Sequence, residues 1–136
     1  MSRKPLPFPQ VAVEFMNRDH AEFAGLREQL LDALAFGAGA EAISHMLDAL
    51  LDHTGRHFAD EEQMMVEAGF PPYEVHKAEH DHVLAEMDAR VVAWNSEGDR
   101  EILREWIEQA VGDWFIGHVG SMDLVTAAYV QRKGRV

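Results

Sequence analysis

Four long segments of this sequence carry apolar residues at alternating three- and four-residue intervals, the spacing that places side chains on one face of an α-helix. We therefore expect helices at about 14–36, 41–68, 72–96 and 99–128. Gly69 and Gly98 follow the second and third segments, as glycine commonly does after a helix, and Asp99 can cap the fourth. The alternation typical of β-strands is absent. The fold class is expected to be all-α.

The connections between these segments are short, which favours antiparallel neighbours in space. The chain is therefore predicted to form an up-down-up-down antiparallel four-helix bundle. Pro5, Pro7 and Pro9 exclude a helix at the start, so residues 1–12 are expected to form an extended N-terminal arm. A chain of 136 residues suits one domain, spanning residues 1–136.

The composition excludes several classes of function. A formal charge of −12, from 24 acidic and 12 basic residues, argues against nucleic acid or an anionic membrane surface as a partner. The chain has no cysteine, which excludes disulfides, iron–sulfur clusters and thiol catalysis. No segment approaches the roughly 18 apolar residues of a membrane span, and the first ten residues lack the apolar run of a signal peptide. A cytoplasmic protein is expected.

Histidine occupies positions where the apolar stripes call for a hydrophobic residue. Five of the eight histidines, and one glutamate, do so: His20, His57, Glu61, His76, His80 and His118. A single buried histidine is more often a hydrogen-bonded core residue than a metal ligand. Here, however, every helical segment contributes one, and burying all six groups without partners would cost a few kcal/mol each. The joint pattern therefore predicts a metal centre inside the bundle.

Asp123 is a further candidate, five residues after His118. Five residues at about 100° each turn a side chain about 140° away from the face of the first, so a regular helix would not aim both at one centre. A π-bulge adds one residue to a turn and aligns such a pair, and π-bulges are frequent at functional sites. Judged from the residues alone, a solvated Asp123 near the end of the helix is slightly favoured.

Taken together, His20, the run HFADEE at 57–62, the run HKAEH at 76–80 and the run HVGSMD at 118–123 resemble the hemerythrin family, specifically single-domain bacteriohemerythrins. The resemblance covers essentially the whole chain. It implies a four-helix bundle that holds a non-haem di-iron centre and binds O2 reversibly. It also makes Asp123 a ligand.

Carried over by motif, the resemblance assigns three histidines to one iron, namely His76, His80 and His118. It assigns His20 and His57 to the other iron, and it makes Glu61 and Asp123 the carboxylates that bridge the two. Iron with such ligands is at most about six-coordinate. Five imidazoles, two bridging carboxylates and a bridging oxide or hydroxide then leave one position open, on the iron with two histidines. A single vacancy suits a small diatomic ligand.

The resemblance also implies an apolar wall around that vacancy, formed by five residues: Phe23, Phe58, Trp114, Phe115 and Val119. His53 stands where the family commonly has a tyrosine, one turn before His57. It is expected either to be a hydrogen-bond partner near the site or to be solvated. Glu62 is expected to be a solvated neighbour of Glu61.

The expected function is therefore reversible O2 binding, for carriage, storage or delivery, rather than catalysis. An enzyme that turns over peroxide, nitric oxide or ferrous iron, and a sensor of O2, redox state or NO, remain the alternatives. Carboxylate-rich di-iron oxidases use two Glu-x-x-His pairs, whereas only Glu79 and His82 have that spacing here, and they lie off the stripe. A structural zinc site would close with four ligands. The expected ligand is O2, and the question of a protein acceptor of O2 is left open.

Overall fold

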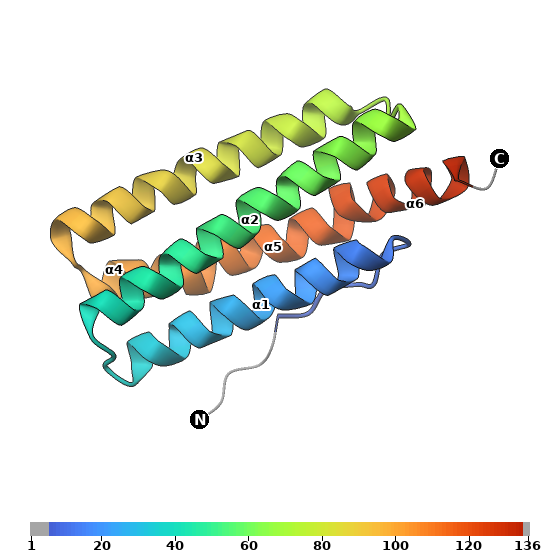
Figure 1. Cartoon of the computed structure of the whole chain (residues 1–136). Helices are drawn as coiled ribbons and strands as arrows, with labels where there is room; N and C mark the ends of the chain where they lie inside the picture. The colour runs from blue at the N-terminus through green and yellow to red at the C-terminus, as the bar shows by residue number, and fades with distance from the viewer. Residues whose placement is uncertain (1–5, 135–136) are drawn as a thin grey trace.

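The computed structural model describes residues 6–134, in which four long helices run antiparallel to their neighbours (Figure 1). Three of them are single α-helices, and the fourth is an unbroken run of five short elements. In order, the elements are α1 (Glu14–Ala35), α2 (Ala40–Ala68), α3 (Tyr73–Glu97), α4 (Arg100–Glu105), the π-helix η1 (Trp106–Val111), α5 (Gly112–His118), the π-helix η2 (Val119–Asp123) and α6 (Leu124–Lys133). The predicted all-α bundle is confirmed.

The ends of the helices follow the turn and cap residues. Gly69 and Gly98 adopt left-handed backbone conformations, with φ of 64° and 62°, just after α2 and α3. The Asp99 side chain accepts a hydrogen bond from the Ile102 amide over 3.0 Å and caps the start of α4. The bounds of α1, α2 and α3 agree with the predicted ones to within one residue.

The fourth helix is longer than predicted, because α6 continues to Lys133 instead of ending near residue 128. Packing explains the extra turns. Tyr129 contacts the Phe70 ring, with 5.2 Å between centroids, and its hydroxyl donates to the Gly69 carbonyl. The end of α6 is thereby held against the connection between α2 and α3. Tyr129 itself, which lies just past the predicted end of the helix, was the sequence feature that could have indicated this contact.

Two π-helical turns interrupt the fourth helix. The turn η2, at Val119–Asp123, is the distortion that the spacing of His118 and Asp123 requires. The turn η1, at Trp106–Val111, was not predicted. Arg27, which is buried in α1, donates from its guanidinium to the carbonyls of Ile107 and Glu108 over 3.1 and 3.0 Å. Arg27 therefore satisfies acceptors in η1 and ties α1 to the fourth helix.

The described part of the N-terminal arm, residues 6–12, is non-helical as expected, and residues 1–5 lie outside the described residues. The Asn17 side chain both accepts from the Val11 amide (2.7 Å) and donates to the Val11 carbonyl (2.9 Å). Phe8 packs edge-on against His20 and Phe115, with centroid distances of 6.2 and 5.3 Å. The arm thus covers one side of the bundle near His20.

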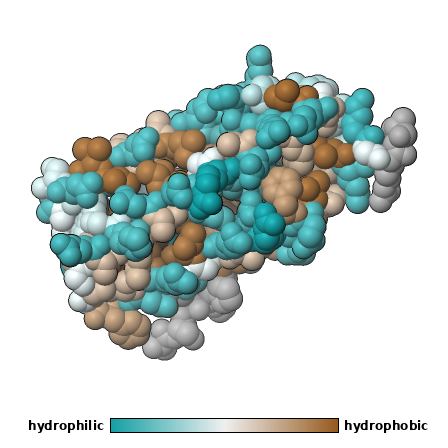
Figure 2. All heavy atoms as spheres, viewed as in Figure 1, coloured by the Kyte–Doolittle hydropathy of each residue, from teal (hydrophilic) through white to brown (hydrophobic). Residues whose placement is uncertain are grey.

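Hydrophilic residues cover much of the face shown in Figure 2, with separate hydrophobic patches among them. Inside, the core is apolar except for a band of polar side chains contributed by all four long helices. Within residues 6–134, no helix combines the length and apolarity needed to cross a membrane.

The Arg27 contacts lead to a stability prediction. Replacing Arg27 with Met keeps a long side chain at this buried position but removes the donor to two carbonyls of η1 and a partner of Glu28. The metal-free protein should therefore lose about 2 kcal/mol or more of unfolding free energy. Urea denaturation measures this loss. Arg56→Met is the control, because the Arg56 side chain is 72% exposed and pairs with Asp52 one turn away on the same helix. It should change stability by less than about 0.5 kcal/mol. Equal losses in both variants would contradict the assigned role.

Candidate metal centre

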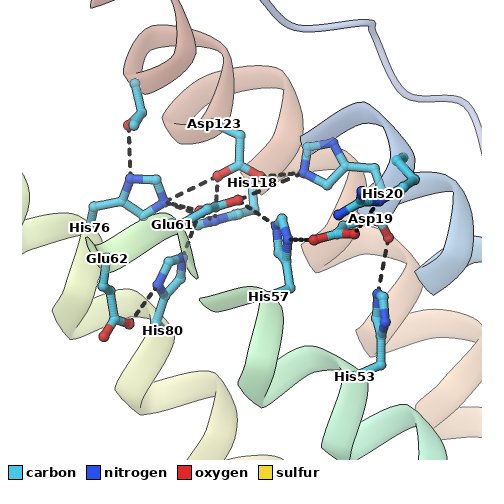
Figure 3. A network of polar contacts seen from close by, with 12 residues as sticks. Asp19, His20, His53, His57, Glu61, Glu62, His76, His80, His118 and Asp123 are labelled. Atoms are coloured by element: carbon cyan, nitrogen blue, oxygen red, sulfur yellow. Dashed lines mark hydrogen bonds and ion pairs between the residues drawn. The ribbon is translucent and has the colours of Figure 1, made fainter. Parts of the chain in front are cut away.

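Five imidazoles from four helices converge on one point inside the bundle (Figure 3). Each ring is at most 7% exposed, and each turns its Nε2 atom toward two carboxylates. The histidines are His20 from α1, His57 from α2, His76 and His80 from α3, and His118 from α5. Spacings of four residues in α2 and α3 place two polar groups of each helix on its inner face. Of the three remaining histidines, His45 and His82 are exposed, and His53 is described below.

Glu61 lies at the centre of this cluster and is completely buried. Its Oε1 atom is 3.4 Å from His76 Nε2 and 3.3 Å from His80 Nε2. Its Oε2 atom points the other way, 2.5 Å from His57 Nε2 and 4.0 Å from His20 Nε2. The two oxygens of one carboxylate therefore face two different sets of imidazoles.

Asp123 repeats this arrangement from the opposite side and is only 1% exposed, so the solvated alternative is wrong. Its Oδ1 atom lies 3.1 Å from both His76 Nε2 and His118 Nε2, and its Oδ2 atom lies 2.9 Å from His20 Nε2. The η2 turn makes this possible, since it aligns Asp123 with His118 five residues earlier.

The ligand-type atoms form two groups that share both carboxylates, and within each group all of these atoms lie within 4.8 Å of one another. The three-histidine group consists of His76, His80 and His118 with Glu61 and Asp123, and the two-histidine group of His20 and His57 with the same two carboxylates. All seven residues singled out from the sequence are thus brought together, in the division that the family resemblance implies.

The chemistry of these atoms fits a bound cation. Several buried nitrogen and oxygen atoms at the centre have no hydrogen-bond partner: His57 Nε2, His80 Nε2, both oxygens of Glu61, and Asp123 Oδ1. Leaving such atoms unsatisfied costs about 1–3 kcal/mol each, and more when they are charged. Imidazole nitrogen and carboxylate oxygen are ligands of divalent and trivalent transition metals. Metal ions between the two carboxylates would satisfy these atoms together.

The site keeps its charges despite burial. Burial and the charge of Asp123 raise the pKa of Glu61, but the adjacent imidazoles of His57 and His80 outweigh them and hold that pKa below its usual value. Burial likewise raises the pKa of Asp123, but the adjacent imidazoles of His118, His20 and His76 hold it well below the usual range. Burial lowers the pKa of His57, yet the adjacent Glu61 carboxylate and the hydrogen bond to Asp19 raise it to about 9. An arriving cation would displace this proton, because a ligand must be deprotonated.

Three imidazoles are held by an outer partner on Nδ1. His57 Nδ1 bonds to Asp19 Oδ2 over 2.8 Å, His80 Nδ1 to Glu62 Oε2 over 2.9 Å, and His76 Nδ1 to Thr126 Oγ1 over 2.9 Å. Such partners fix the tautomer and orientation of a metal-binding histidine.

Sequence reasoning missed these outer partners. The prediction that Glu62 is solvated is wrong, because its side chain is 19% exposed and is bonded to His80. Asp19 and Thr126 are buried but were not identified. Asp19 lies three residues after the stripe residue Met16, and Thr126 three residues after Asp123. A spacing of three residues from an inward-facing side chain was the sequence feature that could have identified both residues.

His53 is a hydrogen-bond partner near the site, which decides between the two alternatives left by the sequence. Its Nε2 atom is 3.1 Å from the carbonyl oxygen of Asp19, whose carboxylate holds His57. The His53 ring lies parallel to that of His57, with an interplanar angle of 4°. Its side chain is only 11% exposed.

A small cavity of about 20 Å³ lies against the two-histidine group. Its lining includes His20 and His57 together with four of the five expected wall residues: Phe23, Phe58, Trp114 and Phe115. The fifth, Val119, is buried in the core but does not line the cavity. Asp19, His53 and Thr54 complete the lining, and the Thr54 hydroxyl is already bonded to the Leu50 carbonyl.

Comparison with known proteins agrees with this geometry. The chain is 35% identical over 116 residues to a bacteriohemerythrin from Ralstonia nicotianae, an alignment that covers 85% of this chain and 80% of that protein. It is 31% identical over 124 residues to one from Aquifex aeolicus, covering 91% and 94%. A crystal structure of wild-type hemerythrin has the same fold, with a TM-score of 0.82 at 24% identity, over 96% of this chain and 97% of the other.

The family model for the hemerythrin HHE cation binding domain matches residues 11–129, which include all seven residues of the two ligand groups. This match and the curated relatives agree with the resemblance seen in the sequence. The buried cluster of histidine, glutamate and aspartate is the feature that a cation-binding domain requires. This chain belongs to the hemerythrin family.

Proposed function

We propose that this protein binds O2 reversibly at a di-iron centre held by the two ligand groups. His76, His80 and His118 would hold one iron, and His20 and His57 the other. Glu61 and Asp123 would bridge the pair. Two ferrous ions held there would supply the two electrons that binding of O2 requires, without an external reductant.

The shared carboxylates support a pair of metals over a single one. Glu61 and Asp123 each direct one oxygen toward each group of imidazoles, as the distances from their four oxygens show. One cation could not use all of these atoms, because the oxygens of each carboxylate face opposite groups. Imidazole and carboxylate together suit iron, and a closed four-ligand zinc site would leave ligands unused.

The position of the small cavity is the observation that carries the O2 proposal. The cavity contacts His20 and His57 but none of the three histidines of the other group. The ligand count would leave the vacancy on the iron held by His20 and His57, which is the group that the cavity contacts. A volume of about 20 Å³ exceeds the roughly 10–15 Å³ that one water needs and suits a diatomic molecule.

The residues around the cavity would keep water from the bound ligand. Phe23 stacks on Phe115 with 4.8 Å between ring centroids, and Trp114 stands edge-on to Phe58 at 5.9 Å. An apolar wall of this kind disfavours entry of water and protons, which would otherwise promote irreversible oxidation. The same cavity has no room for a larger substrate, which favours O2 binding over catalysis at this position.

Reversibility tests the proposal directly. The purified protein is loaded with iron, reduced, and exposed to air. We expect a visible charge-transfer band that appears with O2 and fades on degassing, through repeated cycles. Irreversible conversion to the ferric form with release of peroxide would instead favour a redox enzyme and contradict O2 carriage.

The two-histidine group should be essential for O2 binding. His57→Ala removes one of its two imidazoles, so the variant should lose the O2-dependent band. His45→Ala is the matched control on the same helix, because His45 is exposed and lies outside the site. An unchanged O2 spectrum in His57→Ala would refute the assignment of His57.

Trp114 should limit the entry of water. Its ring lines both the small cavity and a surface groove of about 320 Å³, whereas Trp106 lines the groove but not the small cavity. The indole nitrogens of both residues donate to glutamates of α3. Trp114→Phe should therefore speed conversion of the O2-bound protein to the ferric form severalfold, measured by the decay of its visible band. Trp106→Phe controls for loss of an indole at the same groove, and equal decay rates in both variants would contradict the role of Trp114.

A further inference from the structure

The Nδ1 atoms of the five histidines have unequal partners. Those of His57 and His80 are bonded to carboxylates, and that of His76 is bonded to a hydroxyl. Those of His20 and His118 are buried with no hydrogen-bond partner in the described part of the chain. Only two of the five rings therefore have a negatively charged partner behind them.

These two rings belong to different ligand groups. His57, bonded to Asp19 of α1, is in the two-histidine group, and His80, bonded to Glu62 of α2, is in the three-histidine group. Each bond joins neighbouring helices, α1 to α2 and α2 to α3. Figure 3 shows the two carboxylates on opposite sides of the shared pair, Glu61 and Asp123. The outer carboxylates are thus distributed one to each group.

The two outer carboxylates, Asp19 and Glu62, also have similar surroundings, because each has a surface cation near it. Arg18 Nε lies 3.2 Å from Asp19 Oδ1, and Lys77 Nζ lies 4.0 Å from Glu62 Oε1. Both cations are substantially exposed, with 64% and 40% of their side chains accessible. Each outer carboxylate therefore has a buried imidazole on one side and a surface cation nearby, although Lys77 Nζ itself is hydrogen-bonded to Asp81.

A carboxylate that accepts a hydrogen bond from Nδ1 has two effects on a metal-binding imidazole. It keeps the proton on Nδ1, so that the Nε2 lone pair faces the metal, and it makes the ring more basic. A more basic ligand stabilises the higher oxidation state of the metal it binds. A hydroxyl such as that of Thr126 can donate or accept, so it enforces neither effect.

We propose that Asp19 and Glu62 are a matched pair of positioning residues, one for each metal, that bring the reduction potentials of the two metals close together. This inference rests on the proposed di-iron centre. Two metals of similar reduction potential could each give up one electron when O2 binds, which is what a two-electron reaction of O2 needs. Together with Glu61 and Asp123, the pair also brings the number of carboxylates at or next to the site to four.

The test is a stepwise reductive titration of the ferric protein, without O2, in which EPR spectroscopy measures the mixed-valence state. The variants are Asp19→Asn, Glu62→Gln and the double substitution, each of which removes charge with little change of shape. Glu74→Gln is the control, because Glu74 is an exposed carboxylate at the start of α3.

Each single variant should raise the potential of one metal only, so the mixed-valence state should accumulate well above its wild-type level. In the double variant both potentials should rise, and the mixed-valence state should decline again toward that level. Single variants that match Glu74→Gln would overturn the proposal, as would a double variant that accumulates more mixed-valence state than either single variant.

A second measurement does not depend on iron. In the zinc-loaded protein, the Nδ1 proton of His80 should resonate at the low field typical of a bond to a carboxylate, and it should move upfield in Glu62→Gln. A wild-type His80 without a proton on Nδ1 would overturn the proposal. Neither measurement uses O2, so a protein that shows the expected pattern but no reversible O2 band would refute O2 binding and leave the paired role of Asp19 and Glu62 standing.

Discussion

The burial of two carboxylates, Glu61 and Asp123, is the constraint on which the rest of the structure depends. Both are almost inaccessible to water, and they lie in the middle of a bundle whose core is otherwise largely apolar. Buried charges persist only when they are paired or bind metals. The five imidazoles supply that pairing here, and each carboxylate divides its two oxygens between two groups of them. This division gives two unequal groups of ligand-type atoms, which the proposed pair of metals would occupy.

The fourth helix shows how the backbone meets this requirement. A regular helix would direct His118 and Asp123 to different sides, and the π turn η2 brings them to the same side. The second π turn, η1, leaves acceptors that Arg27 reaches from α1. The helix is therefore distorted at the site and also one helix segment away, where a buried guanidinium supports the distortion. Function and stability are linked through the same element.

Much of the fold could be predicted because its signals are local. The apolar spacing, the glycines after α2 and α3, and the cap at Asp99 each depend on neighbouring residues, and each is confirmed. The convergence of the histidines could be predicted from their positions on the stripes of all four helices. Asp123 could not be placed from the residues alone, because its position depends on a π turn that spacing permits but does not require. The family resemblance supplied the missing information.

The features that sequence reasoning missed are contacts between elements. Asp19, Thr126 and Arg27 are polar residues at or beside stripe positions, and their partners lie on other helices. A polar residue at such a position indicates that a partner exists, but the partner is known only once the helices are packed. Glu62 was misread for the same reason, since the ring that it holds belongs to α3. The extension of α6 likewise depends on a contact of Tyr129 with the end of α2.

In the proposed centre, Glu61 and Asp123 are shared by two irons. The most direct measurement combines the iron content per chain with the EPR spectrum of the fully ferric protein. We predict two irons per chain and no EPR signal, because bridging ligands couple the two ferric spins antiferromagnetically. One iron per chain, or the signal of isolated high-spin ferric ions, would contradict the account.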